Sequence, residues 1–134
     1  MIALDTSVVV ASFGAWHEDH RLALGVLAER PRLGAHTALE SYSVLTRLPE
    51  PFRADATTVV TFLRHTFTGP RLVLDREAQE GLPDRLAACG VEGGAVYDGL
   101  IALTATASGA ELVTLDTRAL GTYARCGANA RLLV

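Results

Sequence analysis

Short apolar runs alternate with amphipathic stretches along this chain. Runs of three or four apolar residues bounded by turn residues are typical of buried strands, whereas apolar positions three and four apart predict helices. The chain is therefore expected to alternate strand and helix. The expected strands cover residues 2–4, 32–36, 71–74 and 112–115, and the expected helices begin near residue 8 and cover residues 16–29, 37–49, 56–67, 76–89 and 97–108.

Local signals mark several of the helix ends. Thr37 and Glu40 have the spacing of a capping box, and Asp55 can cap the helix that follows it. Gly81 and Pro83 interrupt the stretch 76–89, which is therefore two short helices or one bent helix. These signals support the helix assignments made from periodicity.

Alternation of strand and helix predicts an α/β protein, a three-layer α/β/α sandwich with a mainly parallel central sheet. With 134 residues, 49% of them hydrophobic, and no internal repeat, the chain is expected to form a single domain over residues 1–134. In open parallel sheets, functional sites lie beyond the carboxyl ends of the strands.

Four carboxylates fall at that edge of the expected sheet. Asp5 and Asp116 follow the first and last expected strands, and Glu40 and Asp98 lie in the opening turns of helices. Each can be explained locally as a cap or as a complement to a helix N-terminus, and Asp75 shows that such a position alone does not identify a ligand. Their convergence nevertheless favours a metal site, because clustered carboxylates repel one another unless a cation lies among them.

The chemistry of these side chains narrows the choice of ion. Oxygen ligands without histidine or cysteine favour Mg²⁺ or Mn²⁺ over zinc. We expect Asp5 and Asp98 to bind the ion directly, and Glu40 and Asp116 to bind it directly or through water. An ion held in this way can activate water and stabilise negative charge on a phosphate, which indicates hydrolytic chemistry.

Composition excludes several other classes of protein. Every basic side chain is arginine, so phosphate binding by a P-loop lysine, Schiff-base catalysis and kinase chemistry are excluded. The net charge of −3 argues against a generally basic surface, so any contact with RNA must be local or metal-assisted. Cys89 and Cys126 have neither the spacing of a zinc site nor that of a disulfide framework.

The histidines carry no metal-site prediction. In the run from His17 to His20, consecutive polar residues on a helix point in different directions, which indicates a solvated helix start. His36 and His65 have no acidic or cysteine partner at an informative spacing.

A cytoplasmic protein without a membrane segment is expected. No apolar stretch approaches the roughly 20 residues of a membrane span, and the first residues lack the basic and long apolar regions of a signal peptide.

Four segments resemble, in order, the signature segments of PIN-domain ribonucleases of the VapC toxin type. They are IALDTS at 2–7, ESYSVLTRLP at 40–49, VYDGLIA at 96–102 and VTLDTRA at 113–119. The resemblance runs nearly end to end. It implies an endoribonuclease that depends on Mg²⁺ or Mn²⁺ and that forms the toxin of a toxin-antitoxin pair.

The resemblance also implies roles for individual residues. The implied ligand set is Asp5, Glu40, Asp98 and Asp116, and Thr114 matches a hydroxyl residue that helps to hold the acidic cluster. Arg47 matches an arginine to which no role is assigned.

The implied partners are an RNA substrate, a cognate antitoxin protein and a second copy of the chain. Val44, Leu45, Val59 and Val60 provide apolar helix surface that could pack either against that copy or in the core of one chain.

Two other classes of protein also place aspartates at the ends of parallel strands. A phosphotransfer receiver needs a lysine, and a haloacid-dehalogenase-like phosphatase needs a second aspartate where Asp5 is followed by Thr6 and Ser7. A PIN nuclease of RNA processing that has no antitoxin, and an inactive PIN module that only binds RNA or protein, remain as alternatives.

Overall fold

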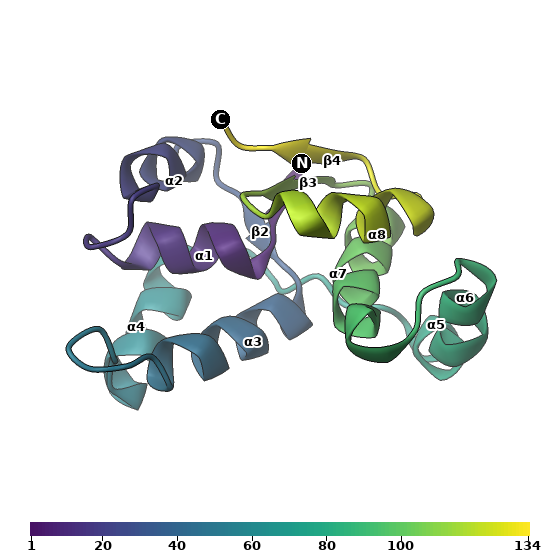
Figure 1. The fold of residues 1–134 in the computed structure, drawn as a ribbon, viewed down its shortest axis with the longest axis horizontal. Helices are drawn as coiled ribbons and strands as arrows, with labels where there is room; N and C mark the ends of the chain where they lie inside the picture. Colours follow the sequence, from purple (N-terminus) through teal and green to yellow (C-terminus); the bar gives the residue numbers. More distant parts are fainter.

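A four-stranded sheet lies between two layers of helices (Figure 1). The computed structural model describes all residues from 1 to 134. The strand order is β2-β1-β3-β4, and every pair of neighbouring strands is parallel, which confirms the predicted α/β fold. The strands are β1 (Ile2–Leu4), β2 (Arg32–Leu33), β3 (Glu111–Thr114) and β4 (Ala130–Leu132).

The helices follow the predicted alternation with the strands. They are α1 (Thr6–Phe13), α2 (His20–Leu27), α3 (Ala35–Thr46), α4 (Ala56–Thr66), α5 (Arg76–Glu80), α6 (Leu82–Ala88), α7 (Val96–Ala107) and α8 (Leu120–Arg125), with 3₁₀ turns η1 (Gly93–Ala95) and η2 (Thr117–Ala119). No single helix is long and apolar enough to cross a membrane, although α6 and the segment Gly93–Ala107, bent by 115° at their junction, together have the required length and composition.

Side chains on the two faces of the sheet build two separate cores. Successive residues of a strand point to opposite faces, so Ala3 and Leu112 contribute to one core, with residues of α6, α7 and α8. Leu4 and Val113 contribute to the other core, with residues of α1 to α4. The helices thus cover both faces and leave the carboxyl ends of the strands free to carry polar residues.

The boundaries of α2 and α3 differ from the prediction. Residues 14–19 form turns, in which His17 Nδ1 accepts a hydrogen bond from the Asp19 backbone, so α2 begins at His20 rather than at residue 16. Helix α3 begins at Ala35 after the N-cap Gly34, so the predicted capping box of Thr37 and Glu40 is wrong. Thr37 lies inside the helix and is buried there.

The outer parts of the sheet were also predicted incorrectly. The expected strand 71–74 is reduced to a single bridge between Leu72 and Gly34, because Pro70 has no N–H to donate and Asp75 already caps α5. Strand β4 was not predicted, because its three residues are too few and too polar to stand out. It forms because β3 offers it a free edge, where Leu133 N–H donates to the Thr114 carbonyl at 2.8 Å.

Other local predictions are confirmed. Asp55 caps α4 by accepting a hydrogen bond from the Thr58 backbone, and the interrupted stretch 76–89 forms two short helices that meet at Gly81. Of the four apolar residues considered for a partner surface, Leu45 and Val59 are fully buried in the core of this chain, whereas Val60 is exposed.

Candidate active site

Asp5 connects β1 to α1 at the carboxyl edge of the sheet. Its backbone N–H donates to the Val113 carbonyl at 3.1 Å, and its side chain caps α1. Oδ1 accepts hydrogen bonds from Ser7 Oγ at 2.5 Å and from the Val8 N–H at 3.4 Å, and Oδ2 accepts one from the Tyr123 hydroxyl at 2.8 Å. Asp5 is 3% exposed, so both carboxylate oxygens depend on these donors.

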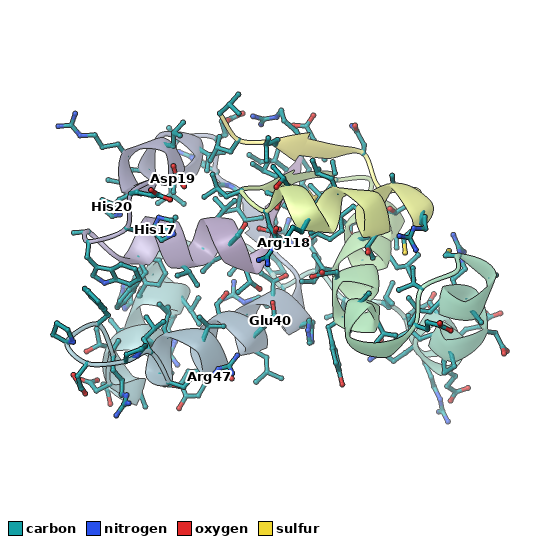
Figure 2. All side chains as sticks on the ribbon, viewed as in Figure 1. His17, Asp19, His20, Glu40, Arg47 and Arg118 are labelled. Carbon is teal, nitrogen blue, oxygen red and sulfur yellow. The ribbon has the colours of Figure 1, made fainter.

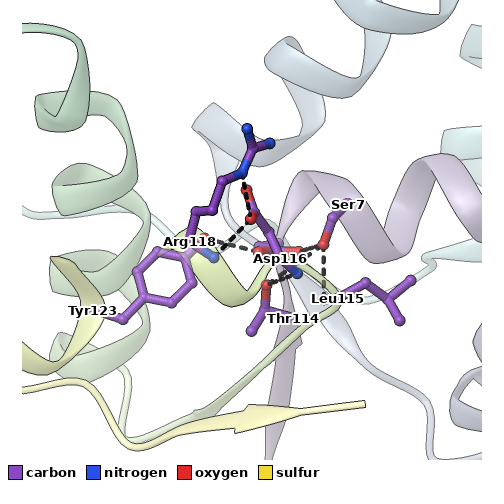
Figure 3. A network of polar contacts seen from close by, with 7 residues as sticks. Ser7, Thr114, Leu115, Asp116, Arg118 and Tyr123 are labelled. Carbon is purple, nitrogen blue, oxygen red and sulfur yellow. Dashed lines mark hydrogen bonds and ion pairs between the residues drawn. The ribbon is translucent and has the colours of Figure 1, made fainter. Parts of the chain in front are cut away.

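A network of hydroxyl groups joins the ends of β1 and β3 (Figure 3). The Ser7 hydroxyl accepts a hydrogen bond from the Leu115 N–H at 2.9 Å and lies 3.5 Å from the Thr114 hydroxyl. Thr114 Oγ1 in turn accepts a hydrogen bond from the Asp116 N–H at 2.9 Å. Ser7 and Thr114 therefore hold Asp5 and Asp116 at neighbouring positions of the sheet edge.

All four carboxylates singled out in the sequence line one cavity of about 200 Å³. Asp5 comes from the end of β1, Glu40 from α3, Asp98 from the first turn of α7 and Asp116 from the segment after β3. The rest of the lining is formed by Thr6, Ser7, Ile101 and Tyr123. Residues separated by more than a hundred positions in the chain thus face the same space.

Burial and like charge act on the acids of this cavity. Burial raises the pKa of Asp98, and the neighbouring carboxylates of Glu40, Asp5 and Asp116 raise it further. Burial also raises the pKa of Asp5, against the opposing effect of its hydrogen bonds from Ser7 and Tyr123. Since burial and the nearby Asp5 raise the pKa of Tyr123 as well, its hydroxyl keeps its proton and acts as a donor.

Two of the carboxylates also contact basic side chains. Glu40 Oε2 lies 3.5 Å from His36 Nε2, and Asp116 Oδ1 accepts hydrogen bonds from the backbone and Nε of Arg118 at 2.9 and 3.4 Å. Figure 2 shows Glu40 and Arg118 approaching the middle of the molecule from different elements. In this arrangement no three Asp, Glu, His or Cys side chains converge closely enough to enclose an ion.

The donor set of the cavity nevertheless fits a hard cation. The lining offers carboxylate and hydroxyl oxygens and no thiol or imidazole, which is the chemistry that Mg²⁺ and Mn²⁺ select. A cation would also offset the mutual repulsion that raises the pKa of Asp98.

Sequence reasoning missed three residues around the cavity. Tyr123 contacts Asp5 from 118 positions away, so no local pattern could identify it. Ser7 contacts Leu115 from 108 positions away, and only its short-range bond to Asp5 could have been found locally. The prediction that His36 has no acidic partner is wrong, because Glu40 lies one helical turn after it and its carboxylate is 3.5 Å from the His36 ring.

The remaining polar residues singled out in the sequence lie elsewhere. Arg47 caps the far end of α3 and is exposed there, outside the lining of the cavity. His20 contacts the carbonyl of Ala11 at 2.8 Å, and Figure 2 shows it with His17 and Asp19 near α2.

A parallel α/β sandwich with an acidic cavity at the carboxyl edge of its sheet is the arrangement of the PIN domain, and the chain belongs to the PIN domain family, whose model matches residues 2–125. Within this family the chain is similar to the VapC ribonucleases of Mycobacterium tuberculosis, as its signature segments predicted. It is 49% identical to ribonuclease VapC40 of strain H37Rv over 125 residues, which cover 93% of each chain. It is 40% identical to ribonuclease VapC27 of the same strain over 127 residues, which cover 94% of this chain and 92% of that one.

A solved structure has the same fold. The structure described as FitAB bound to an IR36 DNA fragment superposes with a TM-score of 0.69, covering 98% of this chain and 94% of that chain. Because only 20% of the residues are identical, this similarity concerns the fold alone.

Replacing Ser7 by alanine is expected to lower the free energy of unfolding by about 1–3 kcal/mol. The Leu115 N–H would lose its only side-chain partner, and Asp5 would lose one donor. Urea denaturation measures the change. Ser43→Ala, an exposed serine on α3, is the control and should leave the midpoint unchanged, whereas equal midpoints for Ser7→Ala and the parent would contradict the role of the network.

Proposed function

We propose that this protein is a metal-dependent endoribonuclease, the toxin of a toxin-antitoxin pair, and that it hydrolyses RNA phosphodiester bonds at the acidic cavity. The observation that carries the proposal is the meeting of Asp5, Glu40, Asp98 and Asp116 in one cavity. The 49% identity to a VapC ribonuclease supports the choice of RNA as substrate.

Mg²⁺ or Mn²⁺ is the proposed cofactor, held by the same four carboxylates. When bound, the ion supplies positive charge opposite the phosphate and acidifies a water molecule for attack. Such an ion would stabilise the ionised form of Asp98, which is half-buried and lies near three other carboxylates.

The residues around the cavity would orient the acids and exchange contacts when a ligand binds. Ser7 and Tyr123 hold Asp5 in one orientation, so that this carboxylate does not need to reorganise during the reaction. Thr114 fixes the backbone that carries Asp116. Glu40 and Asp116, which contact His36 and Arg118, are the side chains that must change partners when a cation or a phosphate enters.

The direct test is RNA cleavage by metal-stripped protein. We expect no cleavage in EDTA and cleavage after addition of MgCl₂ or MnCl₂, followed on total cellular RNA by sequencing of the new ends. Cleavage that persists in EDTA, or intact RNA in the presence of either metal, would contradict the proposal. A cavity variant purified in the same way controls for contaminating nucleases.

Two partners belong to the same proposal, a cognate antitoxin protein and a second copy of the chain. The relatives support the antitoxin, and the exposed side chain of Val60 leaves apolar surface on α4 for a copy. Co-expression with the product of a short neighbouring gene and light scattering of the purified protein test the two separately. A PIN nuclease of RNA processing would act on RNA in the cytoplasm without such a neighbouring gene.

A further inference from the structure

Two aromatic rings stack beside the acidic cavity. His36, in the first turn of α3, and Tyr97, in the first turn of α7, have ring centroids 5.6 Å apart and planes inclined by only 12°. Tyr97 directly precedes Asp98, and the ring of His36 also contacts Glu40 at 3.5 Å. The stacked pair is therefore attached to two of the four acidic residues of the cavity.

Tyr97 contributes little to the packing of the fold. It belongs to neither hydrophobic core, and it is 56% exposed. His36 stacks on one face of the ring, so a further planar group can stack only on the opposite face. Because both residues are anchored in helices, the ring of Tyr97 is held in place rather than carried on a flexible loop.

The negative charge of the molecule favours stacking over phosphate contacts as the way to hold RNA at the cavity. The net charge is −3, and the cavity itself gathers four acidic side chains, so long-range attraction of the phosphate backbone is weak. Stacking of a base on an aromatic ring needs no positive charge, and it is a common way of holding single-stranded RNA.

We infer that Tyr97, backed by His36, is the platform on which an RNA base next to the scissile phosphate stacks. This inference rests on the proposed nuclease function and adds a substrate subsite to it. The contact of His36 with Glu40, which lines the cavity, places the stacked base close to the bond that is cut.

A second exposed aromatic pair provides a matched control. Trp16 and Phe52 have ring centroids 4.9 Å apart, and Phe52 is 43% exposed. Phe52 lies in the loop beyond the far end of α3, away from His36. Any general affinity of exposed aromatic residues for RNA would affect Phe52 and Tyr97 alike.

The kinetic test uses a short single-stranded RNA that spans a mapped cleavage site. Tyr97→Leu, which keeps apolar bulk and loses the ring, should raise KM about ten-fold, with the effect on KM exceeding that on kcat. Tyr97→Phe should restore the parent KM, and Phe52→Leu should leave it unchanged. An abasic nucleotide at the stacked position should raise KM for the parent and have no further effect on Tyr97→Leu.

A binding test is independent of activity. In an Asp98→Asn background, in which cleavage is expected to be too slow to interfere, the fluorescence change of 2-aminopurine at the stacked position should be the same with Tyr97 and with Tyr97→Phe, and lost with Tyr97→Leu. Thermal melts of each variant show whether it is folded.

The results of these tests distinguish failure of the proposed stacking subsite from failure of the proposed nuclease function. If the parent fails to cleave RNA with either metal, the proposed function and the subsite both fall. If the parent cleaves and Tyr97→Leu matches it in KM and in fluorescence, only the subsite is overturned. A Tyr97→Leu variant that handles RNA normally and fails only to bind a partner protein would likewise overturn base stacking in favour of a protein contact.

Discussion

Asp98→Asn is expected to lower the rate of metal-dependent RNA cleavage by about 10³-fold. This factor corresponds to the loss of several kcal/mol of charge stabilisation in the transition state. The fold should survive, because asparagine has the same shape and Asp98 is only half-buried. Rates measured under single-turnover conditions with MgCl₂ or MnCl₂ test this. If the variant cleaves RNA at the parent rate, Asp98 does not take part in cleavage.

The same substitution should make the metal-free protein more stable. The pKa of Asp98 is raised above its ordinary value of 3.8 by burial and by three carboxylates, so the folded state binds its proton more tightly than the unfolded state does. This contribution to stability is fully present below pH 3.8 and is lost as the pH rises through the raised pKa. At neutral pH the ionised Asp98 therefore destabilises the fold, and asparagine relieves this.

Thermal melts with and without metal test this prediction. In EDTA at neutral pH, Asp98→Asn should melt above the parent, whereas saturating MnCl₂ should raise the melting temperature of the parent more than that of the variant. Asp75 provides the control, since it also follows an apolar run and caps α5, but it does not line the cavity. Asp75→Asn should leave cleavage and its metal dependence unchanged.

Tyr123→Phe is expected to lower the free energy of unfolding by about 1.5–3 kcal/mol, the range for a hydrogen bond to a charged group. The substitution removes one hydroxyl from a side chain that is 1% exposed and leaves Oδ2 of the buried Asp5 without its donor. The affinity for Mn²⁺ should fall by about 10- to 100-fold, because a residue that orients a ligand is lost.

The pH dependence distinguishes this effect from a simple packing defect. The destabilisation should shrink at low pH, because a protonated Asp5 needs the donor less than an ionised one. Urea titrations over a pH series and calorimetric titration with MnCl₂ measure the two effects. Tyr42→Phe, which removes the hydroxyl of a tyrosine outside the cavity, is the control, and equal losses for both variants would argue against a specific bond to Asp5.

Much of the fold was readable from the sequence because the decisive signals are local. The apolar run before Asp5 and the helix after it are adjacent in the chain, and the parallel arrangement then follows from the alternation of strands and helices. Because the strands are parallel, the carboxyl ends of β1 and β3 lie at the same edge of the sheet. Strand β4 gave no such signal, since it exists only because β3 has an edge to be covered.

The surroundings of the acids were less predictable than the acids themselves. The hydrogen bond from Tyr123 to Asp5 joins positions 118 residues apart, and its existence depends on how α8 packs against the sheet. The contact of His36 with Glu40, by contrast, lies within one turn of α3 and could have been found from helical spacing.

The order in which the four acids occur along the chain has a consequence for translation. A ribosome delivers Asp5 and Glu40 early, Asp98 much later and Asp116 later still, followed by Tyr123. A nascent polypeptide that has not yet reached these last positions lacks half of the acidic pocket and the donor that orients Asp5. On the proposed mechanism, an unfinished chain cannot cut the messenger that encodes it, and activity arises only once the carboxyl-terminal segments have been synthesised and have folded onto the sheet.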